Sequence, residues 1–140
     1  MIQNILLATD GSSAAQEAAD FAASLALRFQ ARVIVLNAFT PASARSSEPH
    51  PSRMPHNSLD EARALVVNVA RRFREMEIQN VDTEVMEGPA ANVILGVAET
   101  RKPDLFVMGA RGSSTWQGHM LGSVSMAVTL RAECPVLVVK

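Results

Sequence analysis

The chain has 140 residues, of which 48% are hydrophobic and 19% charged, a balance typical of one globular domain with a packed core. Its 13 basic and 14 acidic residues give a formal net charge of −1, which excludes the strong positive field that nonspecific nucleic-acid binding requires. Polar residues interrupt every apolar stretch well before the roughly 18 residues of a membrane-spanning helix. We therefore expect a single cytoplasmic domain over residues 1–140, with no nucleic-acid or membrane partner.

The chain contains one cysteine, Cys134. A single cysteine excludes an intrachain disulfide and a cysteine-rich metal cluster, so no metal site is predicted. Neither a histidine nor a helix N-terminus stands beside Cys134 in the sequence to lower its pKa. We expect this residue to pack as a small hydrophobic side chain.

The first half of the chain alternates apolar runs with a helical pattern. The run Ile5–Ala8 is apolar at every position, as in a strand buried on both faces of a parallel sheet, and Ser12 or Ser13 can cap the helix that follows. A second apolar run spans Val33–Leu36, and the Pro- and Ser-rich stretch 40–57 predicts a surface loop. The expected apolar face of the first helix consists of Ala14, Ala18, Phe21, Ala22, Leu25 and Phe29.

The second half continues the alternation. Ser58 and Glu61 form a capping-box pattern at the start of a second helix. The expected apolar face of that helix consists of Leu59, Ala62, Val66, Val69, Phe73 and Met76. The remaining expected elements are strand 83–86, a helix after Gly88–Pro89, strand 105–108, a Gly- and Ser-rich loop at 110–121, helix 123–131 and strand 136–139.

This βαβαβαβαβ order predicts a Rossmann-like α/β fold, a doubly wound domain with a five-stranded parallel sheet. Parallel strands need right-handed helical crossovers, which cover both faces of the sheet. Ligands of such sheets bind outside the carboxyl ends of the strands, where the strand order reverses. The candidate site therefore lies after four strand ends: Ala8, Leu36, Met86 and Met108.

A glycine motif follows the fourth strand. Gly109-Ala110-Arg111-Gly112 is followed, after nine residues, by Gly122-Ser123-Val124-Ser125, a G-x-x-G-x9-G-S pattern. Glycines let backbone N–H groups approach an anion closely, and the start of a helix adds free amides and a favourable dipole. The motif therefore suggests a phosphate site to which the Ser123 and Ser125 hydroxyls could donate. The alternative is that the glycines merely turn the chain and that Ser123 caps the last helix.

This motif, the start Ala8-Thr9-Asp10-Gly11-Ser12 and the tail Cys134–Lys140 together resemble the ATP-binding branch of the universal stress protein family. The Glu87-Gly88-Pro89 turn and the Pro103-Asp104 entry to the fourth strand resemble the family too, so the resemblance spans nearly the whole chain. It implies an adenine nucleotide alpha hydrolase-like fold. It also implies that the cofactor is ATP or a related adenine nucleotide, alone or with Mg²⁺.

The resemblance further implies residue roles. Asp10 would bind the ribose, Thr9 and Ala38 would border the adenine, and Met108 with Gly109 would lie beneath the nucleoside. The residues implied to surround the phosphates are Arg111, Gly112, Gly122, Ser123, Val124 and Ser125, and Ala8 completes the binding set. The pair Asn37-Ala38 replaces a commoner His and branched aliphatic pair. From the residues alone, Asp10 could equally be a turn or helix-dipole carboxylate.

The expected function is that of a nucleotide sensor or stress-response regulator, with a homodimer formed through strand 136–139. The alternatives are a nucleotide-free dimeric module and a slow ATP hydrolase. No Walker lysine follows a glycine loop, and no G-x-G-x-x-G follows the first strand. Met86-Glu87 stands where a response-regulator receiver would need an Asp at the end of its third strand. His119 is a lone loop histidine, and no catalytic residue is assigned.

Overall fold

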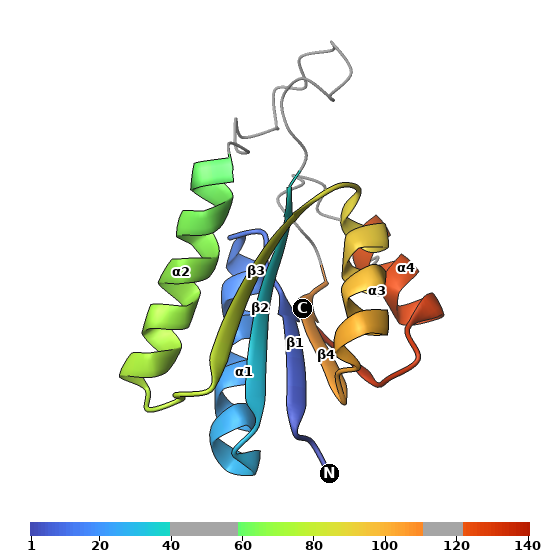
Figure 1. The fold of residues 1–140 in the computed structure, drawn as a ribbon. Helices are drawn as coiled ribbons and strands as arrows, with labels where there is room; N and C mark the ends of the chain where they lie inside the picture. Colours follow the sequence, from blue (N-terminus) through green and yellow to red (C-terminus); the bar gives the residue numbers. More distant parts are fainter. Residues whose placement is uncertain (40–58, 111–121) are drawn as a thin grey trace.

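The computed structural model describes residues 1–39, 59–110 and 122–140. Strands and helices alternate strictly through these residues, which confirms the predicted element order (Figure 1). No helix in the described ranges is long and apolar enough to cross a membrane. The elements are β1 (Asn4–Ala8), α1 (Ser13–Phe29), β2 (Arg32–Phe39), α2 (Leu59–Glu75), β3 (Val81–Glu87), α3 (Ala90–Arg101), β4 (Leu105–Gly109), α4 (Ser123–Arg131) and β5 (Val136–Val139).

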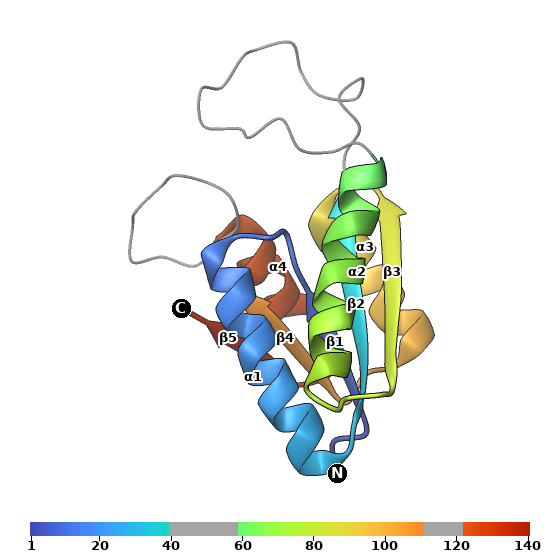
Figure 2. The same ribbon diagram turned by 90° about the vertical axis from the view of Figure 1, so that its left-hand side faces the viewer.

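The strands form one parallel sheet in the order β3-β2-β1-β4-β5. The central strand β1 pairs with β2 on one side and β4 on the other, so Ile5 lies between Val33 and Leu105. Helices α1 and α2 cover one face, and α3 and α4 cover the other (Figures 1 and 2). The predicted doubly wound α/β fold is confirmed, and the order reverses between β1 and β4.

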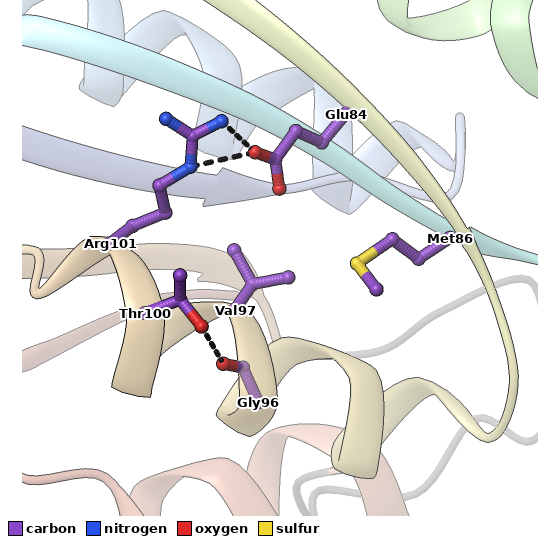
Figure 3. A pocket seen from close by; sticks show the side chains of 6 residues that line it. All are labelled: Glu84, Met86, Gly96, Val97, Thr100 and Arg101. Carbon is purple, nitrogen blue, oxygen red and sulfur yellow. Dashed lines mark hydrogen bonds and ion pairs between the residues drawn. The ribbon is translucent and has the colours of Figure 1, made fainter.

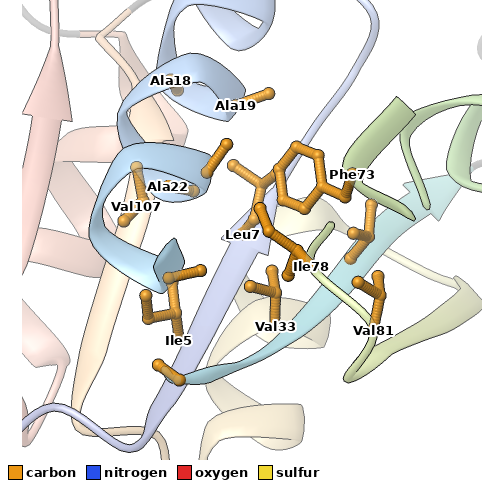
Figure 4. Close-up of a cluster of buried hydrophobic side chains, with 14 of the residues drawn as sticks. Ile5, Leu7, Ala18, Ala19, Ala22, Val33, Phe73, Ile78, Val81 and Val107 are labelled. Atoms are coloured by element: carbon orange, nitrogen blue, oxygen red, sulfur yellow. The ribbon is translucent and has the colours of Figure 1, made fainter. Parts of the chain in front are cut away.

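The core on the α1/α2 face joins strand valines and leucines to a row of alanines. Leu7, Val33 and Val35 are fully buried there, and Phe73 of α2 packs beside them (Figure 4). Alanine has the smallest side chain that still favours a helix, so α1 can approach the sheet closely. The buried residues of α1 are Ala15, Ala18, Ala19, Ala22, Ala23 and Ala26.

The predicted apolar face of α1 is wrong at its two phenylalanines. Phe21 is 53% exposed and Phe29 is 39% exposed. The valines and leucines of the strands already fill the space beneath α1, which leaves room for methyl groups but not for phenyl rings. Leu59, the first residue of α2, and Met76, just after its last residue, were also expected on the buried face, and both are more than one-third exposed.

A second core lies on the α3/α4 face. Its strand residues include Leu6, Leu36 and Phe106, and Val128 of α4 is fully buried against them. Cys134 is partly buried and packs against this cluster, as expected of a small hydrophobic residue. Burial raises the pKa of the Cys134 thiol above its ordinary value, so the neutral form is favoured.

Gly109, at the end of β4, touches the first turn of α1. A Cβ atom there would lie 2.9 Å from the carbonyl carbon and Cβ of Ala14 and 3.1 Å from the Ala15 nitrogen. These neighbours are mostly backbone atoms, which cannot move aside without shifting the helix. Glycine is therefore required here for the approach of α1 to β4.

We expect Gly109→Ala to lower the free energy of unfolding by about 1 to 3 kcal/mol, the usual cost of overpacking. Gly96→Ala is the matched control, because no atom lies within 4 Å of the added Cβ at this position in α3. Gly96→Ala should raise stability by up to about 1 kcal/mol through helix propensity. Urea denaturation measures both changes, and equal stability of the two variants would contradict the packing argument.

Asp104 ties the start of β4 to the start of β1. Its carboxylate Oδ2 accepts hydrogen bonds from the backbone N–H groups of Gln3, at 2.9 Å, and Asn4, at 2.8 Å. These two bonds lower the pKa of Asp104 below its ordinary value of 3.8. A lowered pKa in the folded state means that the ionised form stabilises the fold above pH 3.8, and that this contribution is lost as the pH falls through the folded pKa.

We expect Asp104→Asn to lower the melting temperature at neutral pH and to flatten its dependence on pH in the acid range. The difference between the variant and the wild type should shrink as the pH falls below 3.8. Thermal denaturation between neutral and acid pH measures this difference. Glu99→Gln, which removes an exposed carboxylate from α3, should not reproduce the pattern.

Candidate functional site

The turn after β1 presents Asp10 at the carboxyl edge of the sheet. The Thr9 N–H donates to the Leu36 carbonyl at 2.9 Å, which extends the β1–β2 ladder by one residue. Asp10 is exposed, and its Oδ1 accepts from the Ser12 N–H at 3.0 Å. Thr9 Oγ1 accepts from the Gly11 N–H at 3.3 Å, and Gly11 has φ +80°, a conformation that glycine adopts readily. Asp10 is therefore a turn carboxylate that still faces solvent.

The turn leads directly into α1. Ser12 is the N-cap residue, and its Oγ accepts from the Ala15 N–H at 3.2 Å. The sequence left Ser12 and Ser13 as alternatives, and the structure assigns the cap to Ser12. Gln16 Nε2 donates to the Gly11 carbonyl at 3.3 Å. The backbone around Asp10 is thus held at the N-terminus of the helix.

Strand β2 ends beside this turn. Asn37 is buried, and its Nδ2 donates to the Thr9 carbonyl at 2.8 Å. Ala38 is partly buried and packs against the cluster on the α3/α4 face. The predicted adenine neighbours Thr9 and Ala38 therefore lie at adjacent strand ends. The sequence assigned no role to Asn37, although a polar residue after Val33 and Val35 on the same strand face was a visible signal.

Strand β4 ends on the other side of β1. Met108 is buried, and the Ala110 N–H donates to the Val139 carbonyl at 2.7 Å. The Ala110 carbonyl accepts from the Gly122 N–H and from Ser125 Oγ, both at 2.7 Å. The sequence gave Ala110 no role, yet its peptide groups fix the start of α4 to the end of β4.

The first three amides of α4 have no acceptor within the helix. Gly122 is the N-cap, no side chain caps the helix, and the first intrahelical bond runs from the Met126 N–H to the Gly122 carbonyl at 2.9 Å. The amides of Ser123, Val124 and Ser125 precede this bond and therefore have no acceptor within the helix. The alternative in which Ser123 merely caps α4 is wrong, because Ser123 is the first helical residue.

The serines of this turn differ in accessibility. Ser123 is exposed, whereas Ser125 is 2% exposed, and its hydroxyl donates to the carbonyls of Ala110 and Gly122. The Ser125 hydroxyl is therefore already engaged by main-chain carbonyls, whereas the Ser123 hydroxyl faces solvent. Gly122 has φ −64° and ψ 160°, which any residue can adopt, so its backbone conformation does not require glycine.

The structure brings most of the predicted site to one edge of the sheet, where the strand order reverses. The residues at this edge are Ala8, Thr9, Asp10, Ala38, Met108, Gly109, Gly122, Ser123, Val124 and Ser125. Arg111, Gly112 and His119 lie outside the described residues. Within the described ranges, no group of three or more His, Cys, Asp or Glu residues could hold a metal ion.

A separate depression lies between β3 and α3 (Figure 3). Arg101 Nε donates to Glu84 Oε1 at 2.7 Å across it, and Met86 is 45% exposed at its side. Met86 ends one of the four strands that located the candidate site, but none of the residues assigned a binding role lines this depression. Its lining residues are Glu84, Met86, Gly96, Val97, Thr100 and Arg101.

Comparisons with known proteins match universal stress proteins over 99% or more of this chain. The model of the universal stress protein family matches residues 1–140. A universal stress protein from Thermus aquaticus is 35% identical, with 100% of both chains covered. The solved structure of universal stress protein UspA from Lactobacillus plantarum is 27% identical, with a TM-score of 0.75 and 99% and 98% of the two chains covered. A universal stress protein solved in complex with cAMP is 27% identical, with a TM-score of 0.75 and 99% and 97% covered.

Proposed function

Because the chain belongs to the universal stress protein family, we propose that it binds ATP or a related adenine nucleotide and acts as a nucleotide sensor or stress-response regulator. The observation that carries the proposal is the pairing of two elements at neighbouring strand ends. One is the exposed Asp10 carboxylate after β1, and the other is the first turn of α4 after β4, whose amides have no acceptor within the helix. A ribose diol and a phosphate are chemically complementary to these two elements.

The nucleoside half of the proposed site uses the ends of β1, β2 and β4. Asp10 Oδ1 already accepts one backbone bond, and a carboxylate retains further acceptor positions for ribose hydroxyls. Ala38, at the end of β2, is only partly buried and would border the adenine together with Thr9. Met108, at the end of β4 on the other side of β1, is buried and would lie beneath the nucleoside. The similar universal stress protein that was solved with cAMP supports the choice of an adenine nucleotide as the ligand class.

The phosphate half uses the first turn of α4. The amides of Ser123–Ser125 and the positive end of the helix dipole favour an anion at this position. The exposed Ser123 hydroxyl is available as a further donor. Under the proposal, Arg111 and Gly112 of the glycine motif complete this half.

We expect Gly122→Val to weaken ATP binding at least about a hundredfold, because the side chain would block phosphate from two or more charge-assisted hydrogen bonds of roughly 1.5 to 3 kcal/mol each. The backbone angles at Gly122 suit valine, so the fold should persist. Ser123→Ala should cost about tenfold, because the backbone amides remain. Calorimetric titration of ATP measures these affinities.

Adenosine and Asp10→Ala are the controls for this experiment. Gly122→Val should leave adenosine binding unchanged, because adenosine has no phosphate, whereas Asp10→Ala should weaken ATP and adenosine alike. If Gly122→Val binds ATP as the wild type does, the glycine motif is only a turn. A nucleotide-free module then explains the chain better.

We further propose that two copies pair through β5. This strand forms one edge of the sheet, and Val136–Val138 are only partly buried. An apolar edge strand with unpaired backbone groups favours association with a second strand. A two-fold arrangement would cover this edge in both copies.

We expect Val138→Lys to raise the dimer dissociation constant at least about tenfold, because like charges facing each other across an interface cost several kcal/mol. Sedimentation analysis at micromolar concentration measures the effect. Thr83→Lys is the matched control, because it places the same charge on β3 at the opposite edge of the sheet. A stable monomer in the wild type, or equal dissociation of both variants, would contradict the proposed interface.

A further inference from the structure

The buried polar residues of the described core gather at one place. Thr9, Asn37 and Ser125 are 7%, 6% and 2% exposed, and all three lie at the carboxyl edge of the sheet. Burying a polar side chain is costly unless it forms hydrogen bonds. Ser125 binds the Ala110 carbonyl and so fixes α4. Asn37 makes an equivalent bond to the turn after β1, and no role has yet been assigned to it.

The side chain of Asn37 takes the place of a backbone donor that a regular β1–β2 ladder would supply to the Thr9 carbonyl. The Thr9 N–H donates to the Leu36 carbonyl, so a continued parallel ladder would direct the Ala38 N–H to the Thr9 carbonyl. The Asn37 carboxamide satisfies this carbonyl instead, at 2.8 Å. The backbone of β1 can therefore leave the ladder at Thr9 without an unsatisfied carbonyl.

The bond also orients the next peptide group. Asn37 follows Val33 and Val35 on the strand face that points to α1 and α2, because side chains alternate along a strand. In a planar trans peptide the carbonyl and the following N–H point in opposite directions. When the Thr9 carbonyl accepts from Asn37, the Asp10 N–H is therefore directed away from Asn37.

Among the described residues, the other polar side-chain contacts of the turn are local. They join Thr9 to Gly11, Asp10 to Ser12, and Gln16 to Gly11, so they move together with the turn. The contact of Asn37 comes from a neighbouring strand in the centre of the sheet. It can therefore fix the turn relative to the rest of the site.

We propose that Asn37 is a positioning residue for the nucleoside half of the site, and this inference rests on the proposed function. Its carboxamide holds the Thr9–Asp10 peptide in one orientation before any ligand binds. Asp10 then presents its carboxylate without a further ordering step. Holding a loop in its bound conformation improves affinity by reducing the entropy lost on binding.

The test compares Asn37→Leu with Val35→Ala. Leucine has a similar shape to asparagine but no donor for the Thr9 carbonyl. Val35 lies two residues before Asn37 on the same face of β2, is fully buried and pairs with Leu7. Val35→Ala therefore leaves a small cavity on that face but removes no contact with the turn. It therefore controls for a general loss of stability. Asn37→Ala is a second variant without the bulk of leucine and should show the same pattern.

The first measurement uses nucleotide-free protein. In Asn37→Leu, the NMR signals of the Asp10 and Gly11 amides should shift, and their hydrogen exchange should become faster. Both should stay as in the wild type in Val35→Ala. The second measurement is calorimetric titration of adenosine, for which Asn37→Leu should bind about three- to tenfold more weakly, the size of one net hydrogen bond. Val35→Ala should bind as the wild type does.

The outcomes separate this inference from the proposed function. Unchanged Asp10 and Gly11 signals in both Asn37 variants would overturn the inference, as would equal adenosine affinities of Asn37→Leu and Val35→Ala. If the wild type binds neither adenosine nor ATP, the proposed function fails and Asn37 positions no ligand. The NMR measurement would still show whether Asn37 holds the turn.

Discussion

Helix α1 lies close against β1 and β4 because its buried face consists of alanines and because Gly109 has no side chain. The backbone of the first helical turn then comes within van der Waals distance of the end of β4. This approach sets the place of the Asp10 turn, since Ser12 caps the same helix and Asp10 binds the Ser12 amide. The geometry of the candidate site thus depends on the space left by small residues below it.

Buried hydrogen bonds fix the orientation of the segments that this close packing brings together. Apolar contacts hold helices against the sheet but have little orientational preference. Hydrogen bonds have defined geometry, and an unsatisfied partner inside the protein is costly. Asn37 and Ser125 each bind a main-chain carbonyl at the carboxyl edge, and each contact joins two different elements. These bonds therefore fix the orientation of the turn after β1 and of the start of α4.

The order of helices and strands could be predicted from the sequence, because the buried strands are apolar runs and the helices show a periodic apolar pattern. The sequence was less reliable for which helix face is buried, because Phe21 is apolar enough for the core but too large for the space under α1. The strands β2 and β3 extend beyond their apolar centres, since the ladder continues to Phe39 and Glu87. Backbone pairing, rather than hydrophobicity, sets those ends.

The candidate site was predictable to a similar degree. Parallel strands place their carboxyl ends at one edge, so the element order brought the ends of β1, β2 and β4 together, and the family resemblance supplied Thr9, Ala38 and Met108 as site residues. The contact between Asn37 and Thr9 depends on side-chain orientation at the end of β2, and the bonds to Ala110 depend on where α4 begins. Neither could be derived from residue types or spacing, because both arise from tertiary packing.

The two halves of the proposed site are fixed by different contacts. The turn that carries Asp10 is attached to β2 through Asn37, whereas α4 is attached to β4 and β5 through the peptide groups of Ala110. The halves meet across the boundary between β1 and β4, where the winding direction of the sheet reverses. A ligand that contacts both halves would connect elements that the hydrogen bonds described above leave separate. A nucleotide could therefore couple α1 to α4 in a way that a nucleoside, which reaches only the first half, could not.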